Sequence, residues 1–237
     1  MSIHLAGGGW SPILFENFHR ETQVRAAALA RVIPRIAVLL VDSDPEAGDD
    51  ARTTYTTMLT SLGACEPVVT VLTDGSEADS TLLSDIDGLL IGGGLTPAYL
   101  EAVIPIIDEI RLLVADGLPY LGFSAGAAIA ADTAIIGGWK IGEVPIGAED
   151  IGEDLEDVTV TEGIGLVDLA VDAHAAQWGT LARLIAATEA SLVDGGVAID
   201  ENTVLIVGDG GLRVDGIGSV WRVTGSDEGV LVSTLGA

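Results

Sequence analysis

The sequence predicts an α/β fold with a mostly parallel central sheet and helices on both of its faces. Two observations carry this prediction. Segments rich in Val, Ile and Leu alternate with helix-like segments through the first half of the chain. The strand-like segments are continuous apolar runs, which is typical of parallel strands that are buried on both faces. The second half adds shorter β segments with Gly-rich turns.

In the first half, each element is defined by an apolar run and by the residues that end it. The predicted strands span 35–44, 66–73, 85–94 and 118–123. A helix over 51–64 ends at Gly63, and a helix over 97–117 has Pro97 in its first turn and Gly117 at its end. Small helix-forming residues directly after the last of these strands begin a further helix.

The second half is predicted to contain β segments over 134–142 and 202–225, with a helix over 177–190 between them. The chain has no long linker and no internal repeat. We therefore expect a single α/β domain over residues 1–237.

The charge of the chain limits its partners. The sequence has 36 acidic and 10 basic residues, which gives a net charge of −26. Nucleic acid and anionic membranes bind basic patches, so neither is expected as a partner. No apolar run reaches the roughly 18 residues of a membrane span, and the N-terminus does not resemble a secretory signal. We expect a cytoplasmic protein whose acidity serves mainly for solvation.

Metal and disulfide chemistry find little support in the sequence. The single cysteine, Cys65, excludes an intrachain disulfide and a Cys-rich metal site. The acidic run at 149–158 does not have the spacing of an EF-hand loop, so it is predicted to be a solvated loop. No metal and no organic cofactor are expected.

Ser124 is the candidate nucleophile. It is the centre of a G-x-S-x-G pattern between Gly122 and Gly126, after a strand-like run and before a helix-like one. A nucleophile elbow needs small neighbours because its turn is sharp and tightly packed. The N–H of Ala125 would point toward a bound oxyanion. The alternative is a structural strand–helix turn, which would explain the same glycines.

A serine nucleophile needs a base, and the chain has three histidines. His4 lies in the first short apolar segment and His19 in a predicted surface helix. His174 directly follows an apolar strand-like run, which places it at the active-site edge of an α/β sheet. His174 is therefore the preferred base, with a structural histidine at a strand end as the alternative.

The residues leave the third member of the catalytic group open. Asp172 lies two positions before His174, where an extended chain points both side chains the same way. Glu201 lies at a bend between two apolar strands. Glycine loops at 91–97 and 5–10 allow backbone to approach a substrate closely. The second of these loops could equally be a simple turn.

Four blocks of the sequence resemble the S51 family of serine peptidases, which includes cyanophycinase and aspartyl dipeptidase. These blocks are "IGGGLT", "GFSAGAAIAAD", "GIGLV…VDAH…ARL" and "AIDENTVLIV", in the family's order, over roughly 86–207. The resemblance implies a flavodoxin-like three-layer α/β/α fold. It also implies Ser124 as nucleophile, His174 as base, Glu201 as orienting acid, and the N–H groups of Gly94 and Ala125 as oxyanion hole.

The positions that resemble the family's substrate-binding group differ from it in part. The residues here are Leu95, Thr96, Asp172, Trp178, Thr180, Arg183 and Asn202. Trp178 and Thr180 stand where cyanophycinases have arginines that bind an aspartyl carboxylate. Fewer cations weaken the case for an acidic substrate side chain, so strict aspartyl or cyanophycin specificity is not expected. Trp178 offers an apolar or stacking wall instead.

The function expected from these residues is a serine exopeptidase or dipeptidase acting on short peptides or small amides. The alternative from another class is a non-catalytic, amidotransferase-like binding protein. A glutamine amidotransferase would need a cysteine in the elbow, and an α/β-hydrolase esterase would use Asp172, because its acid precedes the histidine. A homodimer is expected only from the frequency of such assemblies.

Overall fold

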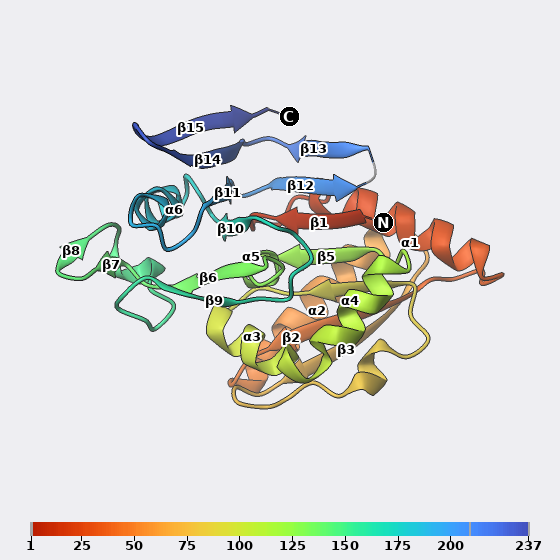
Figure 1. The fold of residues 1–237 in the computed structure, drawn as a ribbon. Helices are drawn as coiled ribbons and strands as arrows, with labels where there is room; N and C mark the ends of the chain where they lie inside the picture. Colours follow the sequence, from red (N-terminus) through yellow and green to blue (C-terminus); the bar gives the residue numbers. More distant parts are fainter. Residues whose placement is uncertain (1, 209, 237) are drawn as a thin grey trace.

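A computed structural model describes residues 2–208 and 210–236. Within this part of the chain, a seven-stranded sheet forms the centre of the molecule (Figure 1). Its order is β13-β12-β1-β5-β4-β2-β3. The strands are β1 (Ser2–Ala6), β2 (Arg35–Val41), β3 (Glu66–Leu72), β4 (Gly88–Ile91), β5 (Tyr120–Phe123), β12 (Thr203–Gly208) and β13 (Gly211–Gly216). The five strands from β1 to β3 in this order are parallel to one another. β12 pairs antiparallel with β1 on one side and with β13 on the other. The predicted fold class is confirmed.

Helices cover both faces of this sheet, and β2 shows why its sequence is a continuous apolar run. Ile36, Val38 and Leu40 pack in the core under α1 (Ile13–Ala28) and α2 (Pro45–Leu62). The alternate residues of the same strand pack in the core on the opposite face. That face is covered by α3 (Thr96–Val103), α4 (Ile107–Ala115) and the short α5 (Ala125–Ala128). Both faces of β2 are therefore buried.

Two of the predicted helices differ from the structure for reasons that single residues explain. The helix predicted over 97–117 is divided by a 3₁₀ turn at Ile104–Ile106. Pro105 causes the break because it has no N–H to donate and its ring clashes with the preceding turn. The helix predicted to begin at 51 begins at Pro45, because Asp44 caps it by accepting the N–H of Glu46 at 2.9 Å.

The later part of the chain adds smaller sheets at the carboxyl ends of the central strands (Figure 1). In the described residues, the second sheet has the order β10-β11-β14-β15. Its strands are β10 (Ala170–Ala173), β11 (Gly195–Ile199), β14 (Val220–Ser226) and β15 (Gly229–Leu235), with α6 (Thr180–Glu189) packed against it. β6 (Thr133–Gly137) pairs with β9 (Thr159–Glu162), and β7 (Lys140–Ile141) with β8 (Val144–Pro145).

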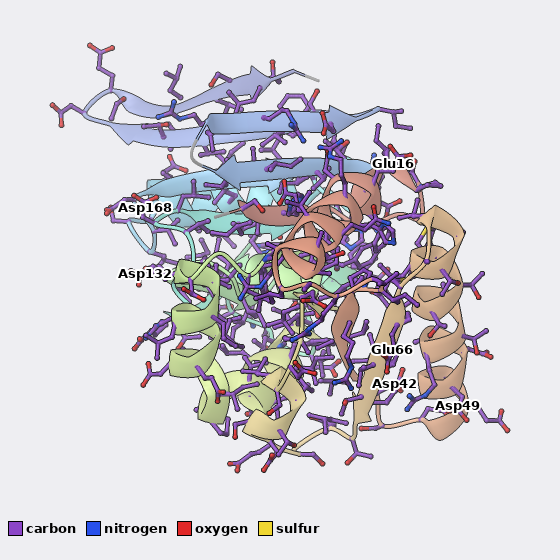
Figure 2. All side chains as sticks on the ribbon, turned by 90° about the vertical axis from the view of Figure 1, so that its right-hand side faces the viewer. Glu16, Asp42, Asp49, Glu66, Asp132 and Asp168 are labelled. Carbon is purple, nitrogen blue, oxygen red and sulfur yellow. The ribbon has the colours of Figure 1, made fainter. Side chains whose placement is uncertain are left out.

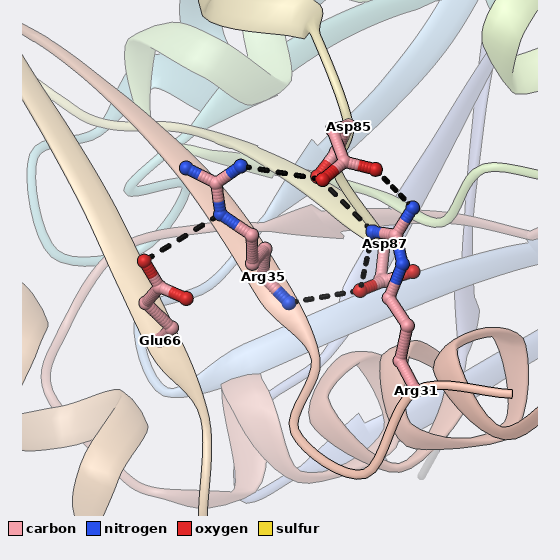
Figure 3. A network of polar contacts seen from close by, with 5 residues as sticks. All are labelled: Arg31, Arg35, Glu66, Asp85 and Asp87. Atoms are coloured by element: carbon pink, nitrogen blue, oxygen red, sulfur yellow. Dashed lines mark hydrogen bonds and ion pairs between the residues drawn. The ribbon is translucent and has the colours of Figure 1, made fainter. Parts of the chain in front are cut away.

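A network of charged side chains joins the amino ends of β2, β3 and β4 (Figure 3). Asp87 is fully buried and accepts the N–H of Arg35 at 2.9 Å and Nη1 of Arg31 at 3.3 Å. Arg31 also pairs with Asp85, and Arg35 lies 3.6 Å from Asp85 and 3.5 Å from Glu66. A buried carboxylate without partners would be strongly destabilising, so this network keeps the start of β4 in register with β2.

Most of the acidic side chains lie on the outside of the molecule. In Figure 2 the labelled carboxylates of Glu16, Asp42, Asp49, Glu66, Asp132 and Asp168 surround the helices and strands rather than entering the core. This distribution agrees with the solvation expected from the composition. Among the described residues, no helix combines the length and the apolar character needed to cross a membrane.

Candidate active site

Ser124 occupies a strained turn between β5 and α5. Its φ of 53° and ψ of −108° lie outside the regions that non-glycine residues usually adopt. The turn also excludes side chains on both sides. A Cβ on Gly122 would lie 2.2 Å from the carbonyl oxygen of Gly126, and a Cβ on Gly126 would lie 2.2 Å from that of Ile91. The two glycines of the G-x-S-x-G pattern are thus required by packing, and the serine hydroxyl is presented at the strand end.

Three strand ends bring together a chain of hydrogen bonds. Ser124 follows β5, His174 follows β10, and Glu201 lies between β11 and β12. Ser124 Oγ is 2.8 Å from His174 Nε2, and His174 Nδ1 is 2.8 Å from Glu201 Oε1. A carboxylate only accepts, so Nδ1–H donates to Glu201 and Nε2 is left to accept the serine proton. This is the geometry of a nucleophile, a base and an orienting acid.

Asp172, the other candidate acid, has a different partner. Its carboxylate accepts Nε of Arg183 at 2.8 Å and Nη2 of Arg183 at 2.7 Å. Both side chains are buried. The esterase alternative required Asp172 to orient His174, and the structure gives that contact to Glu201 instead.

The glycine loop at 5–10, whose role the sequence left open, lies directly against His174. A Cβ on Gly8 would lie 2.1 Å from Cε1 of His174, so only glycine leaves room for the imidazole. The N–H of His174 donates to the carbonyl of Gly7 at 3.0 Å. Asn202 holds the loop from the other side, because its N–H donates to Gly8 O at 2.7 Å and its Oδ1 accepts the N–H of Ser11 at 3.0 Å. The loop therefore fixes the position of the His174 imidazole.

The surroundings of His174 keep it neutral. Burial lowers the pKa of His174 below its ordinary value, and the hydrogen bond to Glu201 opposes part of this shift. A neutral imidazole is the form that can accept a proton from serine at neutral pH. The indole of Trp178 stacks on the imidazole, with ring centroids 3.9 Å apart and an interplanar angle of 8°. The backbone N–H of Trp178 also donates to the backbone carbonyl of His174 at 2.9 Å.

Two backbone N–H groups beside Ser124 are available to a ligand. In residues 2–208 and 210–236, no hydrogen bond has the N–H of Gly94 or Ala125 as its donor. Two tyrosines fix the glycine loop before Gly94: the N–H of Gly93 donates to Tyr55 Oη at 3.2 Å, and Tyr99 Oη donates to Gly93 O at 3.0 Å. Burial raises the pKa of Tyr99 to about 12, so this hydroxyl stays a donor.

A cavity of about 600 Å³ opens beside the nucleophile. Gly94, Leu95, Ser124 and Trp178 line one side of it. The other side consists of Trp139 and the segment 149–156. The acidic run was predicted to be a solvated loop. Several of its side chains are exposed, but the prediction missed that the run forms a wall of this cavity.

Comparison with known proteins places the chain in a family. The family model described as Peptidase family S51 matches residues 45–214. The chain belongs to peptidase family S51. Two curated cyanophycinases, from Synechococcus elongatus and Thermosynechococcus vestitus (strain NIES-2133 / IAM M-273 / BP-1), are each 33% identical to it over 181 residues. The matches cover 73% of this chain and 54% of each cyanophycinase, so the chain spans about half the length of these relatives.

Two solved structures share the S51 chain's fold. The crystal structure of a peptidase from an acI-B1 Actinobacterium has a TM-score of 0.67 and 18% identity, and the match covers 100% of this chain and 95% of that one. A putative peptidase E protein from Listeria monocytogenes EGD-e has a TM-score of 0.57 and 16% identity, over 92% of this chain and 98% of that one. At these identities the likeness concerns the fold alone.

The residues predicted to bind substrate in this S51 site fall into two groups. Leu95 and Trp178 line the cavity, whereas the others are held by protein contacts outside its lining. Thr180 Oγ1 donates to Ala173 O at 2.5 Å, and the N–H of Thr96 donates to Glu153 Oε2 at 3.0 Å. As described above, Asp172 pairs with Arg183 and Asn202 holds the glycine loop.

Arg183, one of the predicted substrate contacts, is held by other parts of the chain. It is 4% exposed. Beyond its two bonds to Asp172, its Nη1 donates to Ile151 O at 2.5 Å and to Gly138 O at 3.3 Å. Its guanidinium therefore ties α6 to Ile151, within the segment 149–156, and to Gly138, next to Trp139, and so holds the cavity wall in place.

Proposed function

We propose that this S51 chain is a serine peptidase that cleaves short peptides, as an exopeptidase or dipeptidase, or related small amides. The observation that carries the proposal is the unbroken set of hydrogen bonds from Ser124 through His174 to Glu201 at the edge of a cavity. A cavity of about 600 Å³ has the size of a small-ligand site, which supports a short substrate.

In the proposed mechanism, Ser124 Oγ attacks the substrate carbonyl carbon while His174 Nε2 takes the hydroxyl proton. The N–H groups of Gly94 and Ala125 donate to the resulting oxyanion, and Glu201 stabilises the imidazolium. His174 then gives its proton to the leaving nitrogen as the C–N bond breaks. Water, deprotonated by His174, attacks the acyl-enzyme and releases Ser124. The mechanism uses no metal and no organic cofactor.

Location and assembly belong to the same proposal. We propose a cytoplasmic enzyme that needs neither nucleic acid nor a membrane, since its net charge of −26 repels both. A homodimer is proposed only on general frequency, and light scattering of the purified chain would test it.

The decisive experiment compares wild type with Ser124→Ala. Wild type should hydrolyse members of a dipeptide and tripeptide library and should be labelled by a fluorophosphonate at Ser124. The variant should keep its fold, as measured by circular dichroism, and lose at least about 10³-fold in kcat/KM together with the label. If wild type neither hydrolyses any peptide nor reacts with the probe, the non-catalytic binding alternative replaces this proposal.

A further inference from the structure

The glycine loop after β4 is held by hydrogen bonds up to one free N–H. The N–H of Gly92 donates to Leu39 O at 3.0 Å, and the carbonyl of Gly92 accepts the N–H of Gly126 at 3.0 Å. Both backbone polar groups of Gly93 are bonded to tyrosine hydroxyls. Within the described part of the chain the N–H of Gly94 donates to no other group, and Gly94 is exposed. This N–H is therefore open to a ligand oxygen, while the backbone before it is fixed.

The two tyrosines reach this loop from opposite faces of the central sheet. Tyr55 lies on α2 and packs in the core on one face, whereas Tyr99 lies on α3 and packs in the core on the other. Both side chains are buried. Tyr55 Oη accepts the N–H of Gly93, which belongs to the peptide unit that begins at Gly92. Tyr99 Oη donates to Gly93 O, which belongs to the same peptide unit as the free N–H of Gly94.

The hydroxyl of Tyr99 affects the N–H of Gly94 because a peptide unit is polarised as a whole. Resonance joins the carbonyl and the N–H of one unit, so a donor on the oxygen makes the N–H a stronger donor. The same bond fixes the plane of the unit and hence the direction of the N–H. The phenol ring also packs here, since a Cβ on Gly94 would lie 3.0 Å from Cε2 of Tyr99. Burial raises the pKa of Tyr99 to about 12, so the hydroxyl remains protonated at neutral pH.

We propose that Tyr99 is a positioning residue of the oxyanion hole, because its hydrogen bond to Gly93 O orients and polarises the peptide unit whose N–H, on Gly94, binds the oxyanion. This inference rests on the proposed peptidase function. Tyr99 acts through Gly94 and needs no contact with the substrate. Negative charge gathers on the substrate oxygen only as the reaction proceeds, so the effect belongs to kcat and not to KM. Removal of a whole oxyanion-hole donor costs about 10²–10³-fold, so weakening one should cost about tenfold.

The test variant is Tyr99→Phe, which keeps the ring and removes the hydroxyl. With the library peptide that wild type cleaves best, kcat should fall about tenfold while KM stays within about twofold. A fluorophosphonate should label Ser124 about tenfold more slowly, because its phosphonyl oxygen accepts the same N–H groups as the oxyanion. Steady-state kinetics and the rate of labelling measure these effects, at a temperature where circular dichroism shows the variant to be folded.

Tyr120→Phe is the matched control, because it removes the same kind of hydrogen bond close by. Tyr120 is fully buried on β5, and its Oη donates to Gly126 O at 2.7 Å. The N–H of that peptide unit belongs to Ala127 and donates to Ser124 O at 2.9 Å, so it is not available to an oxyanion. Tyr120→Phe should lower the free energy of unfolding as Tyr99→Phe does, but it should change kcat and the labelling rate by less than about twofold.

The amide resonance of Gly94 reports the polarisation without any substrate. In ¹⁵N–¹H spectra it should move upfield in Tyr99→Phe and stay in place in Tyr120→Phe, and an unmoved resonance in both variants would contradict the inference.

The kinetic outcomes separate this inference from the proposed function. If the two variants slow labelling equally, or if Tyr99→Phe raises KM and leaves kcat unchanged, the role of Tyr99 is wrong while the peptidase function stands. If wild type cleaves no peptide and Ser124 is not labelled, the proposed function fails, and the inference fails with it.

Discussion

Charged side chains are paired at the amino ends of the central strands and mostly unpaired at the carboxyl end of β5. At the amino ends of β2, β3 and β4, Arg31 and Arg35 pair with Asp85, Asp87 and Glu66 (Figure 3). At the carboxyl end of β5, the cavity beside Ser124 is lined by five carboxylates, and four of them, Glu149, Asp150, Glu153 and Asp154, have no ion-pair partner within the described residues. Paired charges fix strands relative to one another, whereas unpaired charges around a cavity remain available to a ligand. The comparison predicts that mutations at the two ends change different measurable properties.

The largest effect is expected from Glu201→Gln at the carboxyl end. Glutamine can still contact Nδ1 of His174, but it cannot stabilise the imidazolium by charge and it can present an N–H in place of an acceptor. We expect kcat to fall by about 10²–10⁴-fold, with the free energy of unfolding little changed. Steady-state kinetics and urea unfolding measure the two properties.

Asp172→Asn is the matched control for Glu201→Gln. It removes a carboxylate that pairs with Arg183 and lies two residues from His174, so it should lower stability through the loss of a buried ion pair. Its residual kcat should exceed that of Glu201→Gln by at least tenfold. The reverse order would mean that Asp172, not Glu201, orients the base.

The next effect is expected at the opposite end, from Asp87→Asn. The Oδ1 atom of Asp87 is buried without a hydrogen-bond partner in the described residues, so an amide group there would leave a donor unsatisfied and remove the charge that faces Arg31. We expect the free energy of unfolding to fall by about 2–4 kcal/mol. Urea unfolding measures the loss, and kcat of the folded enzyme should stay within twofold of wild type. A large drop in kcat without a loss of stability would break the comparison.

The sequence was most informative where a local rule decides the structure. Continuous apolar runs predicted the parallel strands, and the strand-end positions of Ser124 and His174 singled out two side chains that the structure places 2.8 Å apart. A local rule could not decide whether Asp172 or Glu201 contacts His174. Asp172 lies within β10, where alternation points it toward Arg183. His174 lies just beyond the strand with φ of 58°, so the alternation no longer applies to it.

The parts that sequence reasoning missed depend on segments that meet only in the folded chain. Nothing local to Gly8 shows that a Cβ there would collide with His174, 166 positions later. The approach of the acidic run to Ser124 is also tertiary, because Arg183 on α6 holds the wall through Ile151 and Gly138. One signal was available in the sequence: five of the eight residues at 149–156 are acidic, and this run lies between two predicted β segments.

The smallest effect is expected in the pH dependence of kcat/KM, which reports the interaction between His174 and Glu201. Burial lowers the pKa of His174 from 6.5, and Glu201 raises it again in part. Because the neutral imidazole is the proposed base, kcat/KM of wild type should rise with pH and reach its plateau below the pH at which a free histidine would. In Glu201→Gln the opposing contribution is lost, so the midpoint of the residual activity should move to still lower pH.

The lowered pKa of His174 also determines how its contribution to folding stability changes with pH. The folded-state pKa of His174 lies below the unfolded value, so below pH 6.5 the unfolded chain binds a proton that the folded chain does not. This histidine's contribution to stability is therefore present above pH 6.5 and is lost as the pH falls toward the folded-state pKa. NMR titration of the imidazole in wild type and Glu201→Gln measures both midpoints directly. A midpoint in wild type above 6.5 would mean that the charge of Glu201 outweighs burial, and the base would then be partly protonated at neutral pH.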